Sequence, residues 1–89
     1  MNEEKITWNK EAEQKFHKIL EQIPELIRGI AEIRVTKCAE ELVRADSRSE
    51  ITEKDMVDAL FKETPGGFIP AMKEGLGEVG IDYKQYGHK

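Results

Sequence analysis

Apolar residues recur every three or four positions along most of the chain, which is the spacing of one face of an α-helix. The longest run with this spacing lies between Pro24 and Ala45. Proline is tolerated in the first turn of a helix, because the N–H that it lacks would have no partner there. The pattern therefore predicts a central helix over residues 24–45. Its inward stripe comprises Ile27, Ile30, Ala31, Val35, Cys38, Ala39, Leu42 and Ala45.

Shorter helices are predicted on both sides of the central helix. A first helix over residues 9–22 carries an apolar stripe that includes Phe16, and Trp8 is expected to fold back onto the core. Thr52 and Asp55 stand three positions apart before an apolar run, as in a capping box. A third helix is therefore predicted over residues 53–62.

A fourth, weaker helix is predicted over residues 70–79, where Pro70 can occupy the first turn. Gly75 and Gly77 each cost such a helix about 1 kcal/mol relative to alanine. The length of 89 residues suits one domain. The sequence thus predicts a single all-α domain over residues 1–89, a compact three-helix unit with a weaker fourth helix, and flexible ends at residues 1–6 and 81–89.

The net charge and the composition of the chain argue against several classes of protein. The net charge is −4, whereas non-specific binding to nucleic acid needs an excess of lysine and arginine. The single cysteine excludes an internal disulfide and is typical of a reducing compartment. No apolar run approaches the roughly 20 residues that span a bilayer, and no apolar signal core follows the N-terminus. We therefore expect a cytoplasmic protein that does not enter a membrane.

Candidate chemistry is sparse. His17, Cys38 and His88 are the only soft metal ligands, and no two of them share a metal-ligand spacing. The segment Pro65-Gly66-Gly67 lacks the lysine and hydroxyl of a phosphate loop. The carboxylates lie on predicted solvated helix faces. We expect no catalytic residues, no metal and no cofactor.

A candidate interaction surface lies beside the main stripe of the central helix. Leu26, Ile30 and Ile33 follow one another by four and three residues, with Arg28 and Arg34 nearby. A guanidinium at this place could reach a partner carboxylate or a bound anion, but a salt bridge within the chain, or a stem that lies along apolar surface, is the more frequent role of such an arginine. If the three apolar residues are exposed, they mark a binding site for a partner. If the first or fourth helix covers them, the protein is a monomer with a thicker core. We favour the monomer, because the fourth helix otherwise has nothing to dock on.

The sequence also resembles a known module. The residues that carry the resemblance are Trp8, Glu11-Ala12, Ile23-Pro24, Ile27-Arg28-Gly29, Ala39-Glu40 and Ile51-Thr52. This ordered set is similar to the small C-terminal helical domain found in the B subunit of light-independent (dark-operative) protochlorophyllide reductase, and to the stand-alone bacterial relatives of that domain. The resemblance implies a non-catalytic accessory or interaction domain linked to tetrapyrrole reduction, with nitrogenase-like reductase subunits as protein partners. The chain departs from the pattern of that family at Ile30, Glu32 and Ile33, where the family usually has basic residues.

A second resemblance keeps an alternative open. The central helix, its polar loop and residues 50–60 are similar to the long helix, loop and final helix of histone folds. Such folds pair as dimers, because a lone chain leaves its long helix partly bare. The alternative function is therefore a histone-fold-like dimerisation or nucleic-acid-associated module.

Overall fold

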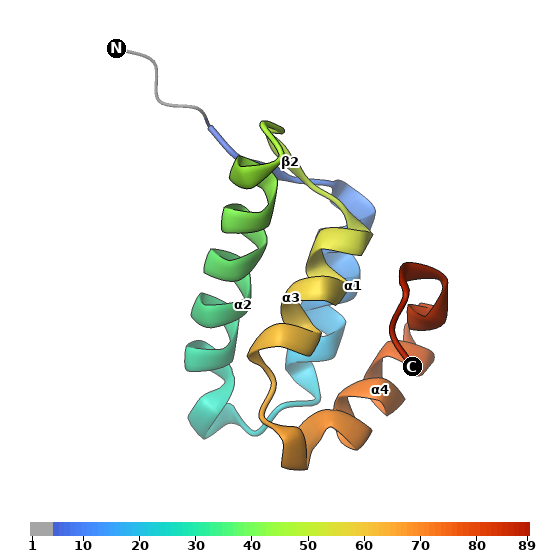
Figure 1. Ribbon diagram of the computed structural model, residues 1–89. Helices are drawn as coiled ribbons and strands as arrows, with labels where there is room; N and C mark the ends of the chain where they lie inside the picture. The colour runs from blue at the N-terminus through green and yellow to red at the C-terminus, as the bar shows by residue number, and fades with distance from the viewer. Residues whose placement is uncertain (1–4) are drawn as a thin grey trace.

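The structure, a computed structural model, describes residues 5–89 and shows the predicted all-α fold (Figure 1). Residues 1–4 of the predicted flexible lead lie outside the described part of the chain. The helices are α1 (Lys10–Glu21), α2 (Glu25–Ala45), α3 (Glu53–Glu63) and α4 (Ile69–Glu78), with short 3₁₀ turns η1 (Gly66–Phe68) and η2 (Tyr83–Tyr86). All four predicted helices are present, and each boundary lies within one or two residues of its predicted place.

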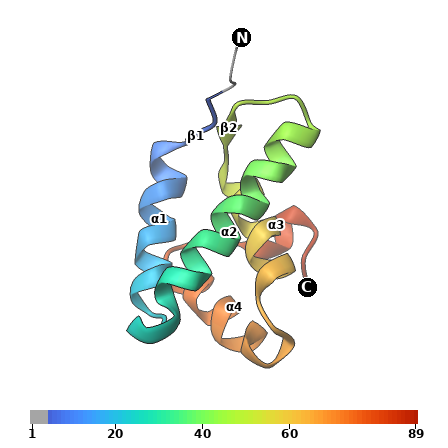
Figure 2. The same cartoon turned by 90° about the vertical axis from the view of Figure 1, so that its left-hand side faces the viewer.

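A short parallel pairing that the helical pattern did not predict joins the start of α1 to the loop after α2. It consists of β1 (Thr7–Trp8) and β2 (Glu50–Ile51), with Thr7 opposite Glu50 and Trp8 opposite Ile51. Asn9 continues the pairing by donating its backbone N–H to the Ile51 carbonyl at 2.9 Å. Because β1 and β2 lead directly into α1 and α3, the pairing places the first turns of these two helices side by side (Figure 2).

Side chains satisfy the free N–H groups at the starts of α1 and α3. The Oδ1 of Asn9 accepts a hydrogen bond from Ala12 N at 3.0 Å. The predicted capping box is confirmed: Thr52 N donates to Asp55 Oδ2 at 2.9 Å, and Asp55 N donates to Thr52 Oγ1 at 3.4 Å. Arg48 donates to both carboxylate oxygens of Asp55, at 2.9 and 2.7 Å. The loop between α2 and α3 is thus fastened to the first turn of α3.

The core lies between the four helices, and its outer edge is closed by Trp8, whose ring stacks on Phe16 with centroids 5.0 Å apart. The predicted stripe of α2 is only partly correct. Val35, Cys38, Ala39 and Val43 are the buried residues of this helix, and the predicted stripe does not include Val43. Leu42 is half-buried, and Ala45 is exposed.

The first half of α2 departs most from the prediction. The sequence pattern places Ile27 and Ile30 in the core, but their side chains are 43% and 57% exposed. An apolar groove separates this half of the helix from the end of α3 and from α4. Helix periodicity reports which residues share a face and does not report whether another element covers that face along its whole length.

The C-terminal part is ordered more extensively than the sequence pattern suggested. Met72, Gly75 and Leu76 of α4 are buried, and a Cβ on Gly75 would stand 3.3 Å from Gln22 Oε1 at the end of α1. Residues 81–89, expected to be a flexible end, pack against α3 instead. Ile81 is 4% exposed.

Polar and aromatic contacts hold these last residues on α3. Tyr86 donates its hydroxyl to Glu53 Oε2 at 2.6 Å. His88 Nε2 lies 2.6 Å from Asp58 Oδ1, and its ring stacks on Phe61 at 4.0 Å. Single contacts of this kind leave no periodic pattern in the sequence, which is why the docking was not predicted.

The observed burial predicts different costs for two leucine substitutions. Leu76 of α4 is fully buried, so Leu76→Ala should reduce the free energy of unfolding by about 2–5 kcal/mol. Leu42 is half-buried, so Leu42→Ala should cost clearly less, although the sequence pattern placed it in the core. Chemical denaturation of both variants measures the difference. Equal costs, or a larger cost for Leu42→Ala, would contradict the observed packing of α2 and α4.

The Asp55 carboxylate predicts an acid-dependent loss of stability. Burial alone would raise the pKa of Asp55, but hydrogen bonds from Arg48 and Thr52 outweigh it and hold the pKa below its usual value. Because the pKa of Asp55 is lower in the folded chain than in the unfolded chain, its ionised carboxylate stabilises the folded state at pH values above about 3.9, the pKa of an unfolded aspartate. This stabilisation is lost as the pH falls through the pKa of Asp55 in the folded chain. Asp55→Asn should cost about 1–3 kcal/mol at neutral pH, since it leaves buried donors poorly paired.

The matched control is Asp46→Asn, since Asp46 also bonds Arg48, at 2.9 Å, but its side chain is 70% exposed. Denaturation from pH 7 down to pH 2 should show a shallower acid slope for Asp55→Asn and a nearly unchanged slope for Asp46→Asn. If the two variants behave alike, the Arg48–Asp55 interaction does not carry the acid dependence.

Candidate functional site

Three large apolar side chains project from the outer side of α2. Leu26 is 92% exposed, Ile30 57% and Ile33 61%. They are named the α2 strip below. In Figure 2, α2 runs across the front of the molecule, and no other described helix lies over it. Contiguous exposed apolar side chains on a small charged protein usually mark an interaction site.

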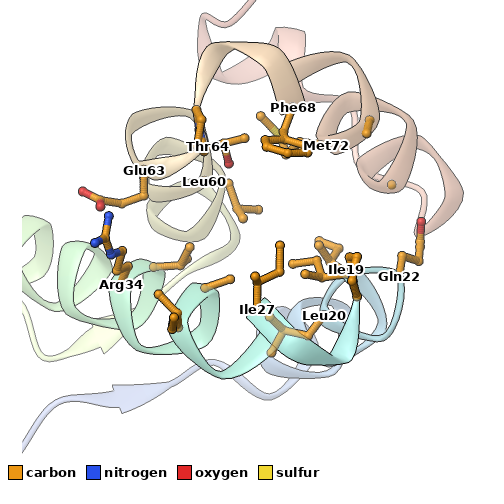
Figure 3. A pocket seen from close by; sticks show the side chains of 18 of the residues that line it. Ile19, Leu20, Gln22, Ile27, Arg34, Leu60, Glu63, Thr64, Phe68 and Met72 are labelled. Carbon is orange, nitrogen blue, oxygen red and sulfur yellow. The ribbon is translucent and has the colours of Figure 1, made fainter.

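An apolar groove of about 440 Å³ lies beside the α2 strip. Figure 3 shows Ile19, Leu20 and Ile27 on one wall, contributed by α1 and α2. The facing wall is formed by Leu60, Phe68 and Met72, which come from the end of α3, from η1 and from α4. This cavity is named the α2–α4 groove. Phe68, at 59% exposed, is the most exposed of the large apolar side chains that line it.

The charged and amide side chains labelled in the α2–α4 groove lie toward its two ends (Figure 3). Arg34 and Glu63 lie at one end and point toward each other, and Gln22 lies at the other end (Figure 3). Between these ends Thr64 adds a hydroxyl, and the other labelled side chains are aliphatic, aromatic or thioether (Figure 3). The groove can therefore bury apolar surface along its length and can offer charges of both signs at one end.

The segment between α3 and α4 keeps the groove open. Thr64, which precedes Pro65, has the extended conformation that a following proline favours, and this ends α3. The turn η1 then leads the chain around the end of the groove and presents Phe68 to it. Pro70 lies in the first turn of α4, where its missing N–H costs nothing. The chain thus leaves α3 sharply and docks α4 near the end of α1 rather than on α2.

The predicted interaction residues divide into three groups. Ile30 and Arg34 line the groove, and Ile30 also belongs to the α2 strip. Leu26 and Ile33 stand outside the groove on the neighbouring side of the helix. Arg28 has a structural role, since its guanidinium donates to the Ile23 carbonyl at 2.9 and 3.2 Å and to the Glu21 carbonyl at 3.3 Å.

Sequence reasoning missed several groove residues. The periodicity places Ile27 in the core, and it gives no sign that Leu60, Phe68 and Met72 are parts of one surface. The sequence signal at this place is the break at Pro65-Gly66-Gly67 next to an aromatic residue, which predicts a turn but not its direction.

The structure shows the surroundings of the candidate reactive side chains. Burial, reinforced by Glu63, raises the pKa of the Cys38 thiol, so the reactive thiolate is disfavoured at neutral pH. His17 is exposed on α1. Within residues 5–89, no three His, Cys, Asp or Glu side chains are grouped so that they could hold a metal ion. In the same range, no helix is long and apolar enough to cross a bilayer.

Fold and site together define a small all-α domain with an uncovered apolar groove. The whole chain, residues 1–89, matches the family described as "Protein of unknown function (DUF2621)", and the chain belongs to that family. No curated protein matches the chain, and no solved structure does.

The family match corrects the resemblance to protochlorophyllide reductase. It covers the full chain and shows no link to that enzyme, to tetrapyrroles or to its reductase subunits. Several residues that carried the resemblance have roles in folding. Trp8 stacks on Phe16, Arg28 bonds carbonyls at the end of α1, and Thr52 caps α3. Such residues can recur wherever helices must begin and end at similar places, so the resemblance was wrong as a guide to the family.

Proposed function

We propose that this chain is a non-catalytic protein-interaction module whose α2–α4 groove binds the apolar face of a helix. The observation that carries the proposal is the groove itself, about 440 Å³ with apolar walls and with Phe68 standing exposed on one of them. Proteins that bind helices in this way receive large side chains spaced three, four and seven residues apart along one helix face.

The walls of the groove favour a helix over a small charged ligand. An anionic amphiphile would need a free cation at the groove end, but Glu63 lies beside Arg34 there and opposes a second negative charge (Figure 3). A helix with side chains of both signs matches this end better. Addition of a strand is also disfavoured, because β1 and β2 are only two residues long each.

Charge disfavours the nucleic-acid alternative. The chain has 14 lysine and arginine residues against 18 aspartate and glutamate residues, and Arg34 is the one cation among the described residues that line the groove. Binding to a phosphate backbone needs several cations on one surface. An apolar partner surface accounts for the groove with no such requirement.

A methyl NMR titration tests the proposal. Met72 lines the groove, whereas Met56 is fully buried away from it, so the two labelled methyl groups act as reporter and internal reference. A short amphipathic helical peptide with leucines spaced four and three residues apart should shift the Met72 signal and leave the Met56 signal in place. A peptide of the same composition in scrambled order should shift neither.

A matched pair of variants locates the binding surface. Phe68→Ala removes an exposed side chain that lines the groove and should weaken peptide binding by about tenfold or more, as expected for an aromatic anchor. Gln14→Ala removes an exposed side chain of α1 that lies outside both the groove and the α2 strip, and it should leave the affinity within about twofold. No response of Met72 to any helical peptide, or equal weakening by both variants, would contradict helix binding in the groove.

A further inference from the structure

We infer that the helix received by the groove is α2 of a second copy of this chain, so that the protein forms a two-fold symmetric dimer. This inference rests on the proposed function, because it names the occupant of the same α2–α4 groove. In such a dimer the α2 strip of each copy covers the groove of the other.

The first support is that one face of the chain carries both parts of such an interface. Leu26, Ile30 and Ile33 have the spacing of four and three residues that a helix-binding groove receives. The groove lies directly beside them, and Ile30 belongs to both surfaces. A symmetric dimer requires one patch that is complementary to itself, and a patch holding a ridge and a neighbouring groove meets this requirement.

Gly29 gives independent support. It lies inside α2 between Leu26 and Ile30, where glycine is less favourable than alanine. A Cβ at this position would meet nothing within 4 Å in the described part of its own chain, so no contact there requires glycine. The close approach of a second chain to the α2 backbone would require it.

The exposed area is sufficient for a dimer of modest stability. Leu26, Ile27, Ile30, Ile33 and Phe68 are between 43% and 92% exposed, which amounts to roughly 600 Å² of side-chain surface per copy. Covering this surface in both copies would bury on the order of 1,200 Å², the lower end of the range for specific protein interfaces. Neighbouring polar rims would add to it.

Charge does not oppose the pairing of this face with itself. Residues 25–37 contain two carboxylates, Glu25 and Glu32, and three cations, Arg28, Arg34 and Lys37. The chain as a whole has a net charge of −4, so its excess of carboxylates lies outside this segment. With Glu63 and Glu74, which also line the groove, the face carries four carboxylates and three cations, so it is nearly neutral and electrostatic repulsion between two copies would be small.

The structure also removes the reason for preferring a monomer. That preference assumed that the fourth helix needs α2 as its docking surface. Instead, α4 packs near the end of α1, with Gly75 beside Gln22, and Ile30 and Ile33 stay exposed.

Sedimentation velocity over a concentration series tests the inference. The wild-type chain should change from monomer to dimer as its concentration rises. Ile33→Glu should remain folded by circular dichroism, because residue 33 is 61% exposed in the single chain, and should stay monomeric at every concentration. Gln14→Glu also adds one negative charge, at an exposed position on α1, and should dimerise like the wild type.

A glycine pair tests close approach at the α2 backbone. Gly29→Gln and Gly77→Gln both replace an exposed helical glycine whose Cβ would meet nothing in the described chain, and Gly77 does not line the groove. Gly29→Gln should abolish the dimer, and Gly77→Gln should leave the association unchanged. A wild type that stays monomeric at all concentrations, or a dimer that survives both Ile33→Glu and Gly29→Gln, would overturn the inference.

The peptide titration separates failure of this inference from failure of the proposed function. A monomeric wild type whose Met72 signal still responds to the helical peptide would refute the dimer and leave helix binding standing. Failure of both measurements would refute the proposed function as well. Peptide that dissociates the wild-type dimer while shifting Met72 would support both.

Discussion

The length of α2 relative to the helices around it is the constraint on which the rest of the structure depends. At 1.5 Å per residue, its 21 residues span about 32 Å, whereas the 12 residues of α1 and the 11 of α3 span only about 17 Å each. The buried residues of α2 all lie between Val35 and Val43. The first half of the helix is left partly uncovered, and both the groove and the α2 strip follow from that.

The starts of α1 and α3 are tied together at the end of the molecule that lies opposite the groove (Figure 1). Arg48, Thr52 and Asp55 link the α2–α3 loop to the start of α3, and the β1–β2 pairing links that loop to the start of α1. At the other end of the chain, His88 and Tyr86 anchor the last residues on α3. Beside the groove itself, Arg28 bonds the carbonyls of Glu21 and Ile23 and so links the start of α2 to the end of α1, which form one wall.

Much of the fold could be predicted from the sequence, because its signals are local. Helical periodicity, Pro24 and the Thr52–Asp55 capping box predicted the helices and their starts. What could not be predicted depends on distant contacts: the β1–β2 pairing, the docking of residues 81–89, and the direction of the chain after Pro65. The candidate site was likewise predictable only in the part that depends on local spacing. Leu26, Ile30 and Ile33 were recognised from spacing, while Phe68 and Met72 joined them only through the path of the chain around the groove.

If the α2 strip of one copy lies in the groove of another, intermolecular nuclear Overhauser effects will connect the two surfaces. In a sample that mixes two differently isotope-labelled populations, we expect contacts between the methyl groups of Leu26 or Ile33 in one copy and the ring of Phe68 or the methyl group of Met72 in the other. These residues come from different walls of the proposed interface, and Leu26 and Ile33 do not line the groove of their own chain. If the chain associates but shows no such contacts, or shows contacts only through other surfaces, the proposed dimer is contradicted.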